Sequence, residues 1–455
     1  MKHVDFKHPQ YEEFSSKWER VRDALDSDRV RSAGTKYLPQ LSGMESKDYQ
    51  AYKQRSFYYG ATRRTRDGIS GLVFRKDATV TLPNNPTAVE LLADVTLGGL
   101  PHDRFAQARF NEELMTGFGG IYVTLPRTSS PSARGYMVMY SAEQIINWRQ
   151  EFIEDKFILT RVVLEEQAPE RESDNPYSVK FVPQFRDLWL DEQGLLVVDV
   201  YQKNANRTSY TGDAGDGFTR VSQILPVVRG QRIDFIPFAF DPHLDDPPLL
   251  PLADANLDHW RLMADYRHGL HWTGLPTPYV IGGPDDETLA IGPNAVWQLD
   301  EGGSAGMLEF TGQGLGAVEK AVAGVRGDMA SLGARLIDTD KAAAETSETH
   351  RLRQGREQAT TATITQKVEA QLSQAETWML NFSGIPGEVD HQLNKDLADE
   401  RLTPEELTAF TSSLQAGAIS YATFYELLQK GELARKGVSA EEEALLIEAG
   451  KEEQI

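Results

Sequence analysis

The spacing of hydrophobic residues changes twice along this chain, and these changes limit the fold more than any other feature of the sequence. Tyr11, Phe14, Trp18, Val21 and Leu25 recur at steps of three and four, which indicates an amphipathic helix. From about residue 119 the period becomes two, and from about residue 250 it is helical again. The sequence therefore predicts an α+β fold, with a strand-rich region between helical ones.

Other segments repeat the helical spacing. Helices are predicted over roughly 47–74, around Ala106–Leu114, and from the end of the proline-rich segment 241–251 to about Trp272. A long helix is expected to end near Leu380, with a bend favoured by the β-branched run at 360–365. The last part of the chain predicts short helices that begin after Thr403, Ser420 and Ser439, of which the first and third start with capping boxes.

Strand spacing first predicts a hairpin of residues 120–125 and 136–140. Further strands are expected at 157–166, 178–190, 195–202 and 218–228, and shorter ones at 278–281 and 295–299. The segment Gly212–Gly217 is interpreted as a turn, because it lacks the ligand spacing and the closing glutamate of a calcium-binding loop.

A second regular pattern lies between residues 318 and 336. Its apolar residues alternate steps of four and three, as in a helix packed lengthwise on a neighbour. They are Val318, Val322, Val325, Met329, Leu332 and Leu336. The segment 338–348 that follows has no apolar anchor and is expected to be an exposed loop.

Length and composition narrow the class of protein. The 455 residues suggest about three domains, and the absence of cysteine excludes disulfides, thiolate metal sites and cysteine nucleophiles. No apolar run approaches the roughly 20 residues of a membrane span, and no signal peptide is evident, so assembly in a cytoplasm is expected. The net charge of −21 predicts that most of the surface repels DNA, whereas static DNA binders carry a basic face.

Two patterns could be mistaken for sites. Gly312–Ala317 fits a dinucleotide-binding fingerprint, but no buried strand follows at the required distance, so a glycine-rich lead into a helix is the favoured interpretation. Asp265, His268 and His271 share a helix face near His259, which is interpreted as a solvated or subunit-contacting face rather than a metal site. With no P-loop or catalytic constellation either, the sequence predicts no enzyme, no cofactor and no metal.

Several segments resemble a portal-like family of phage head proteins. They are Ala33–Pro39, Gly71–Lys76, Tyr140–Arg149, and Leu252–Pro278 with its His-Gly-Leu-His-Trp run. The likeness extends from residue 8 to about residue 430, and the order of predicted elements is also similar. The chain thus resembles the portal proteins of tailed bacteriophages.

This resemblance implies a ring, usually of twelve subunits, at one capsid vertex of the virion, through which the genome is packaged and ejected. Its parts would be a mixed α/β wing, a two-helix stem, a small α/β clip, a tunnel loop and a helical crown. Carried onto this chain, the wing would be 1–250 with the long bent helix at 345–385, and the stem would be 251–274 and 315–337. The clip would be 275–314, the tunnel loop 338–348 and the crown 386–455.

The resemblance also implies partners and surfaces. The partners would be further copies, the terminase large subunit (which hydrolyses the ATP), a head–tail adaptor, and the major capsid and scaffolding proteins. Double-stranded DNA would pass without sequence specificity, and no membrane is involved. The seam at 318–336 would pack subunits together. The clip acids that would face partners are Asp285, Asp286, Glu287, Asp300 and Glu301. The channel candidates are Lys320, Arg326, Asp338, Asp340, Lys341 and Glu345.

Three alternatives to these assignments stay open. Lys320, Arg326 and Lys341 could be ordinary ion-pair partners of nearby acids such as Glu319, Asp328 and Asp340. The whole chain could instead be another oligomeric phage head or connector component. A nucleotide-dependent soluble enzyme is the third reading.

Overall fold

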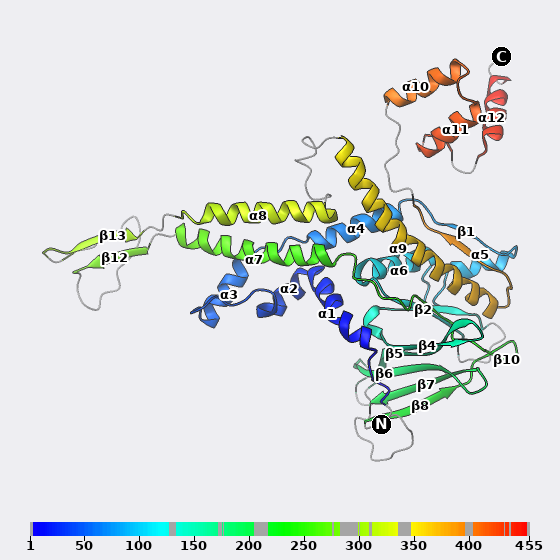
Figure 1. The fold of residues 1–455 in the computed structure, drawn as a ribbon, viewed down its shortest axis with the longest axis horizontal. Coiled ribbons are helices and arrows are strands. Elements are labelled where there is room, and N and C mark those ends of the chain that lie inside the picture. The colour runs from blue at the N-terminus through cyan, green and yellow to red at the C-terminus, as the bar shows by residue number, and fades with distance from the viewer. Residues whose placement is uncertain are drawn as a thin grey trace. The chain divides into compact units, whose positions relative to one another are not determined.

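The computed structural model describes residues 3–126, 133–171, 175, 177–203, 217–274, 277–282, 299, 301–308, 312–334, 347–395, 404–431, 433–435 and 438–452. The chain forms two compact units, Met1–Lys395 and Asp396–Ile455. Helices and several small antiparallel sheets make up the first unit, which confirms the predicted α+β class (Figure 1).

The first helices bury the apolar stripes that the sequence shows. They are α1 (Pro9–Ala24), α2 (Ser27–Ala33), the short 3-10 helix η1 (Gly34–Lys36), α3 (Ser46–Arg55), α4 (Ala61–Val73), α5 (Pro86–Leu92) and α6 (His102–Thr116). All five residues of the α1 stripe are buried. Where one helix was expected over 47–74 there are two, because Ser56 is extended and Tyr58 turns inward to donate a hydrogen bond to the Ala24 carbonyl.

A three-stranded sheet follows, in the order β11-β2-β3. The predicted hairpin is confirmed as β2 (Gly120–Thr124) paired with β3 (Tyr136–Tyr140), and β11 (Phe238–Phe240) adds to the other edge of β2. Gly120 is required there, because a Cβ would lie 2.4 Å from the Phe238 ring.

A larger antiparallel sheet has five strands in sequence order. They are β4 (Ile145–Ile153), β5 (Lys156–Arg171), β6 (Val179–Leu190), β7 (Leu196–Lys203) and β8 (Phe218–Ile224). The predictions for β5, β6 and β7 are confirmed, whereas the last predicted strand ends at Ile224, before the small pair β9 (Val227–Val228) and β10 (Gln231–Arg232). Strand β4, which follows the 3-10 helix η2 (Ala142–Gln144), was not predicted from the sequence. Residues 212–216 of the expected turn lie outside the described ranges.

The long helix is α9 (Ser347–Phe382), which packs on α6 and on the three-stranded sheet. After α9, strand β14 (Asp390–Gln392) pairs with β1 (Thr79–Thr81), so distant parts of the chain meet in one small sheet. Aromatic rings fill the centre of the unit, where Trp18 stacks on Phe118 at 5.9 Å and Phe118 also contacts Trp148.

Between β11 and α9 the chain makes a helical hairpin. Helix α7 (Leu250–Thr273) runs outward, β12 (Thr277–Ile281) pairs with β13 (Ser304–Leu308), and α8 (Leu315–Met329) returns beside α7 (Figure 1). A π-helical turn, η3 (Ala330–Ala334), ends α8. Strand β12 was predicted correctly, but its partner is β13. Residues 295–298 of the other expected strand lie outside the described ranges, and Leu299 is not in a strand.

The second unit consists of short helices. They are α10 (Pro404–Gln415), α11 (Tyr421–Lys430) and α12 (Ala440–Glu452). The predicted cap at Ser420 is confirmed, as is the capping box in which Ser439 and Glu442 each accept the other's backbone N–H, at 3.1 and 2.8 Å. Thr403 lies outside the described ranges. In neither unit do the described helices include one long and apolar enough to cross a membrane.

Candidate assembly and channel surface

The helical hairpin of residues 250–334 is called the arm below, and the rest of the first unit is called the body. The arm begins as a core element, because Leu252, Leu257 and Trp260 on α7 are almost fully buried. The indole of Trp260 donates a hydrogen bond to the Ser56 hydroxyl at 2.9 Å, and the Arg261 guanidinium donates one to the Tyr37 carbonyl at 2.7 Å. The body therefore fixes the root of α7.

The outer half of α7 has a different environment. Leu270 and Trp272 are 44% and 52% exposed, although both are large and apolar. Gly269 lets α8 approach closely here, because a Cβ at this position would lie 2.5 Å from the Leu315 side chain. The two helices are thus packed on each other, and α3 also contacts α7 through Tyr52, but Leu270 and Trp272 stay about half exposed within the described part of the chain.

The predicted seam on α8 divides in the same way. Val318, Val322 and Val325 are half-buried, and Leu332 is 45% exposed. Met329 is only 1% exposed and packs with Ala61 of the body and with Leu252 at the arm root of its own chain. Leu336 lies outside the described ranges. The seam of one chain therefore keeps a partly uncovered apolar row, but Met329 does not belong to that row.

The strand hairpin at the end of the arm also has solvent-exposed apolar side chains. Tyr279, Ile281, Met307 and Leu308 are each between 46% and 61% exposed. None of these four residues was a predicted site residue, although Tyr279 and Ile281 lie in the predicted strand 278–281. Of the predicted clip acids, Glu301 is exposed in the turn before β13, and Asp285, Asp286, Glu287 and Asp300 lie outside the described ranges.

Two of the predicted channel residues can be placed. Lys320 and Arg326 are both exposed on α8. Burial lowers the pKa of the neighbouring His259 on α7, and the Arg326 cation lowers it further, so the guanidinium lies close to the arm root. Asp338, Asp340, Lys341 and Glu345 lie outside the described ranges.

The two patterns set aside in the sequence can also be placed. Asp265 accepts a hydrogen bond from the Tyr52 hydroxyl, and His268 accepts one from the Trp272 indole at 3.0 Å. Gly314 immediately precedes α8, and β13 belongs to an antiparallel hairpin rather than to a parallel sheet. The glycine-rich segment is therefore a lead into a helix, as expected.

A comparison with known protein families matches the part of the chain that contains the arm. Residues 248–383, from the arm through α9, match a family described as a domain of unknown function (DUF4055). No curated protein matches the chain.

Similar solved structures are the necks of GTA (gene transfer agent, phage-like) particles. The neck of an empty particle computed with C6 symmetry has 14% identity and a TM-score of 0.43, over 86% of this chain and 95% of that one. The neck of a native particle computed with C12 symmetry has 12% identity and a TM-score of 0.37, over 88% and 99%.

Proposed function

We propose that this chain is a portal protein of a tailed phage, one subunit of a ring through which DNA enters and leaves the capsid. The observation that carries the proposal is the arm, an antiparallel helix pair with a buried root, half-covered apolar sides and a small strand hairpin at its end. Side chains such as Leu270 and Trp272 need a partner, because exposing large apolar groups in a row is unfavourable. A ring supplies that partner from neighbouring copies of the same helices.

In this proposal α7 and α8 are the stem, and the segment between them is the clip that binds the terminase and later the head–tail adaptor. Electrostatics favours partners with basic patches, because the tip carries several acids and the chain has a net charge of −21. Deleting Asp285–Glu287 should weaken both associations, and most strongly at low salt, where screening is least. If the terminase and the adaptor both bind at full strength after the deletion, this segment is not the clip.

The net negative charge of the chain also supports the proposed DNA channel. Twelve copies would carry roughly 250 excess negative charges, a field that discourages DNA from adhering to the wall. Lys320, Arg326 and Lys341 would supply the local positive charge that centres the duplex. We expect Lys341→Ala rings to assemble normally but to change packaging or retention of DNA. Unaltered packaged length and infectivity, also with Asp338→Ala and Asp340→Ala added, would show that the loop does not touch DNA.

Ring formation is the direct test of the proposal. Native mass spectrometry and negative-stain images of the purified chain should show a closed ring with a central hole. Val325→Asp places a charge in the half-covered seam and should leave soluble subunits, since burying an unpaired charge between subunits is strongly unfavourable. Val89→Asp is the matched control, because Val89 lies on α5 of the body and is 64% exposed.

The outcomes separate the alternatives. If Val325→Asp forms rings as Val89→Asp does, the proposed role of the seam in assembly is wrong. A compact wild-type monomer would favour a soluble enzyme. A thermal melt of the soluble Val325→Asp subunit distinguishes lost assembly from lost folding. A ring that does not bind terminase would indicate another head or connector component.

A further inference from the structure

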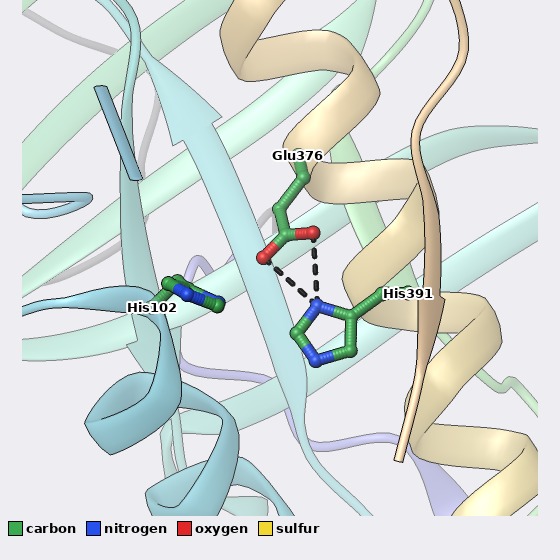
Figure 2. A group of neighbouring side chains, drawn as sticks. All are labelled: His102, Glu376 and His391. Atoms are coloured by element: carbon green, nitrogen blue, oxygen red, sulfur yellow. Dashed lines mark hydrogen bonds and ion pairs between the residues drawn. The ribbon is translucent and has the colours of Figure 1, made fainter. Parts of the chain in front are cut away.

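Three side chains that are distant in the sequence meet in the body of the first unit (Figure 2). His102 is the first residue of α6, Glu376 lies on α9, and His391 is the central residue of β14. One ligand atom from each lies within 4.8 Å of the other two. The rings of His102 and His391 are 5.8 Å apart at an angle of 70°. None of these residues has a part in the ring, clip or channel proposed above.

The cluster is buried and its hydrogen bonding is incomplete. The side chains of Glu376 and His391 are 0% exposed, and His391 Nδ1 lies 3.0 and 3.1 Å from the two carboxylate oxygens. His391 Nε2 and His102 Nδ1 are also buried, and neither has a hydrogen-bond partner within the described part of the chain. Buried polar atoms are nearly always paired, so a missing partner at this place requires an explanation.

The protonation state of the histidines does not provide that explanation. A neutral imidazole has one donor and one acceptor nitrogen, and a charged imidazole has two donors. In every one of these states His102 Nδ1 stays without a partner within the described part of the chain, and so does His391 Nε2. A proton shared with Glu376 therefore satisfies only half of the ring.

We propose that His102, Glu376 and His391 bind a divalent transition-metal ion such as Zn²⁺. Two imidazoles and one carboxylate are a ligand set that suits zinc, whereas Mg²⁺ and Ca²⁺ favour oxygen ligands alone. A divalent cation also compensates the buried carboxylate more fully than a shared proton does. Water would complete a tetrahedral site, reached past His102, whose side chain is 19% exposed.

Binding must draw the cluster together. Ligand atoms about 2.1 Å from a tetrahedral zinc ion are about 3.4 Å apart, so the widest separation has to close by roughly 1–1.5 Å. His102 is the ligand that can move, because Glu376 and His391 are enclosed and already in contact. The ion would therefore pull the start of α6 toward α9 and β14.

The place of the cluster indicates a structural role. Three side chains of α9 already hold the strand segment, since Thr377, Ser373 and Glu369 accept the backbone N–H groups of residues 389, 391 and 393, at 2.9, 2.9 and 2.7 Å. These hydrogen bonds fasten β14 to α9 but not to α6. A metal ion would add α6 to this group and lock the last segment of the first unit in position.

The test uses the full-length protein after chelator treatment and dialysis into metal-free buffer. Zn²⁺ should bind at one ion per chain in calorimetric titration, and it should raise the unfolding temperature, because it binds only the folded state. Co²⁺ in place of Zn²⁺ should give the visible absorption of a tetrahedral ion. Failure of the metal-free protein to take up either ion would overturn the proposal.

Variants locate the ion. His102→Gln removes one ligand but leaves the His391–Glu376 pair intact, so the fold without metal should be unchanged. It should bind Zn²⁺ at least about tenfold more weakly and abolish the tetrahedral Co²⁺ spectrum. His243→Gln is the control, because the His243 side chain is 90% exposed and lies outside the cluster. Equal Zn²⁺ affinity in His102→Gln and wild type would show that the ion binds elsewhere.

Discussion

The body and the arm use hydrophobic residues in opposite ways. In the body, Trp18 is 0% exposed and stacks on Phe118, and the ion pair Arg109–Glu113 is also enclosed. In the outer arm, Trp272 is 52% exposed and the hairpin strands show apolar side chains on the surface. The aromatic centre of the body is therefore completed within one chain, whereas the outer arm leaves large apolar side chains about half exposed within the described part of the chain. The contrast teaches that stability and assembly can be changed separately in this molecule.

The largest expected effect comes from two tryptophans on the same helix. Trp260→Ala at the arm root should lower the free energy of unfolding by about 3–5 kcal/mol, because it leaves a cavity beside Tyr58 and frees the Ser56 hydroxyl. Trp272→Ala should change the stability of a dissociated subunit by only about 0.5 kcal/mol but weaken the ring. Urea unfolding of both variants measures the stability of the subunit, and native mass spectrometry measures the formation of the ring. Equal stability losses would erase the distinction between root and outer arm.

A smaller effect is expected from pH at the arm root. Burial, and secondarily the Arg326 cation, lower the pKa of His259 below its ordinary value of 6.5, while Asp258 opposes this. Below about pH 6.5 the His259 imidazole therefore binds a proton in the unfolded chain but stays neutral in the folded chain, so the free energy of unfolding falls as the pH drops. His8 and His268, whose pKa values burial also lowers, contribute in the same direction.

Comparison of wild type with His259→Gln isolates the contribution of this one histidine. The difference in unfolding free energy between pH 7.5 and 5.5 should be smaller in the variant. The same slope in both proteins would mean that His259 is not held neutral at the arm root.

The smallest effect concerns Arg20 on α1, and Arg22 on the same helix serves as its comparison. Arg20 pairs with Asp254 of the arm at 3.0 Å, and both side chains are well exposed, so Arg20→Ala should lower stability by about 0.2–1 kcal/mol, and less at high salt. Arg22 pairs with the buried Glu112 and with Glu143 inside the body, and its loss should lower stability by about 3–5 kcal/mol. Chemical unfolding at two salt concentrations distinguishes them. A large loss for Arg20→Ala would mean that the arm is held by charge as well as by packing.

Local pattern was enough to predict much of this fold. The stripes of α1 and α7, the β2–β3 hairpin, strands β5 to β7 and the caps at Ser420 and Ser439 all follow from spacing and capping chemistry within a few residues. The break between α3 and α4 did not follow, because the contact that fixes Tyr58 is with Ala24. Polar residues such as Arg149 and Gln150, and a bulge beside them, hid the alternation of β4.

The candidate surfaces were only partly predictable for the same reason. Periodicity placed Val325 and Met329 on one row but could not show that Met329 packs with Ala61 of the body and with Leu252 at the arm root. The spacing of 278–281 indicated a strand, whereas a strand over 304–308 was not predicted, and neither pattern could show that their apolar residues stay exposed. The His102, Glu376 and His391 cluster had no sequence signal, because its members meet only when β14 pairs with β1.

The pairing of β14 with β1 has a consequence for synthesis on the ribosome. Asn394 donates a hydrogen bond to the Leu72 carbonyl, a contact between residues 322 positions apart. At translation rates of about 5–20 residues per second, the early helices must wait roughly 15–65 seconds for α9 and β14 to emerge. Until then the face of α6 that α9 will cover is open to other nascent chains, whereas the arm hairpin can form as soon as it leaves the exit tunnel. A newly made subunit therefore has a completed arm before it has a finished body, and in the proposed ring the order of these two events would decide how many chains assemble.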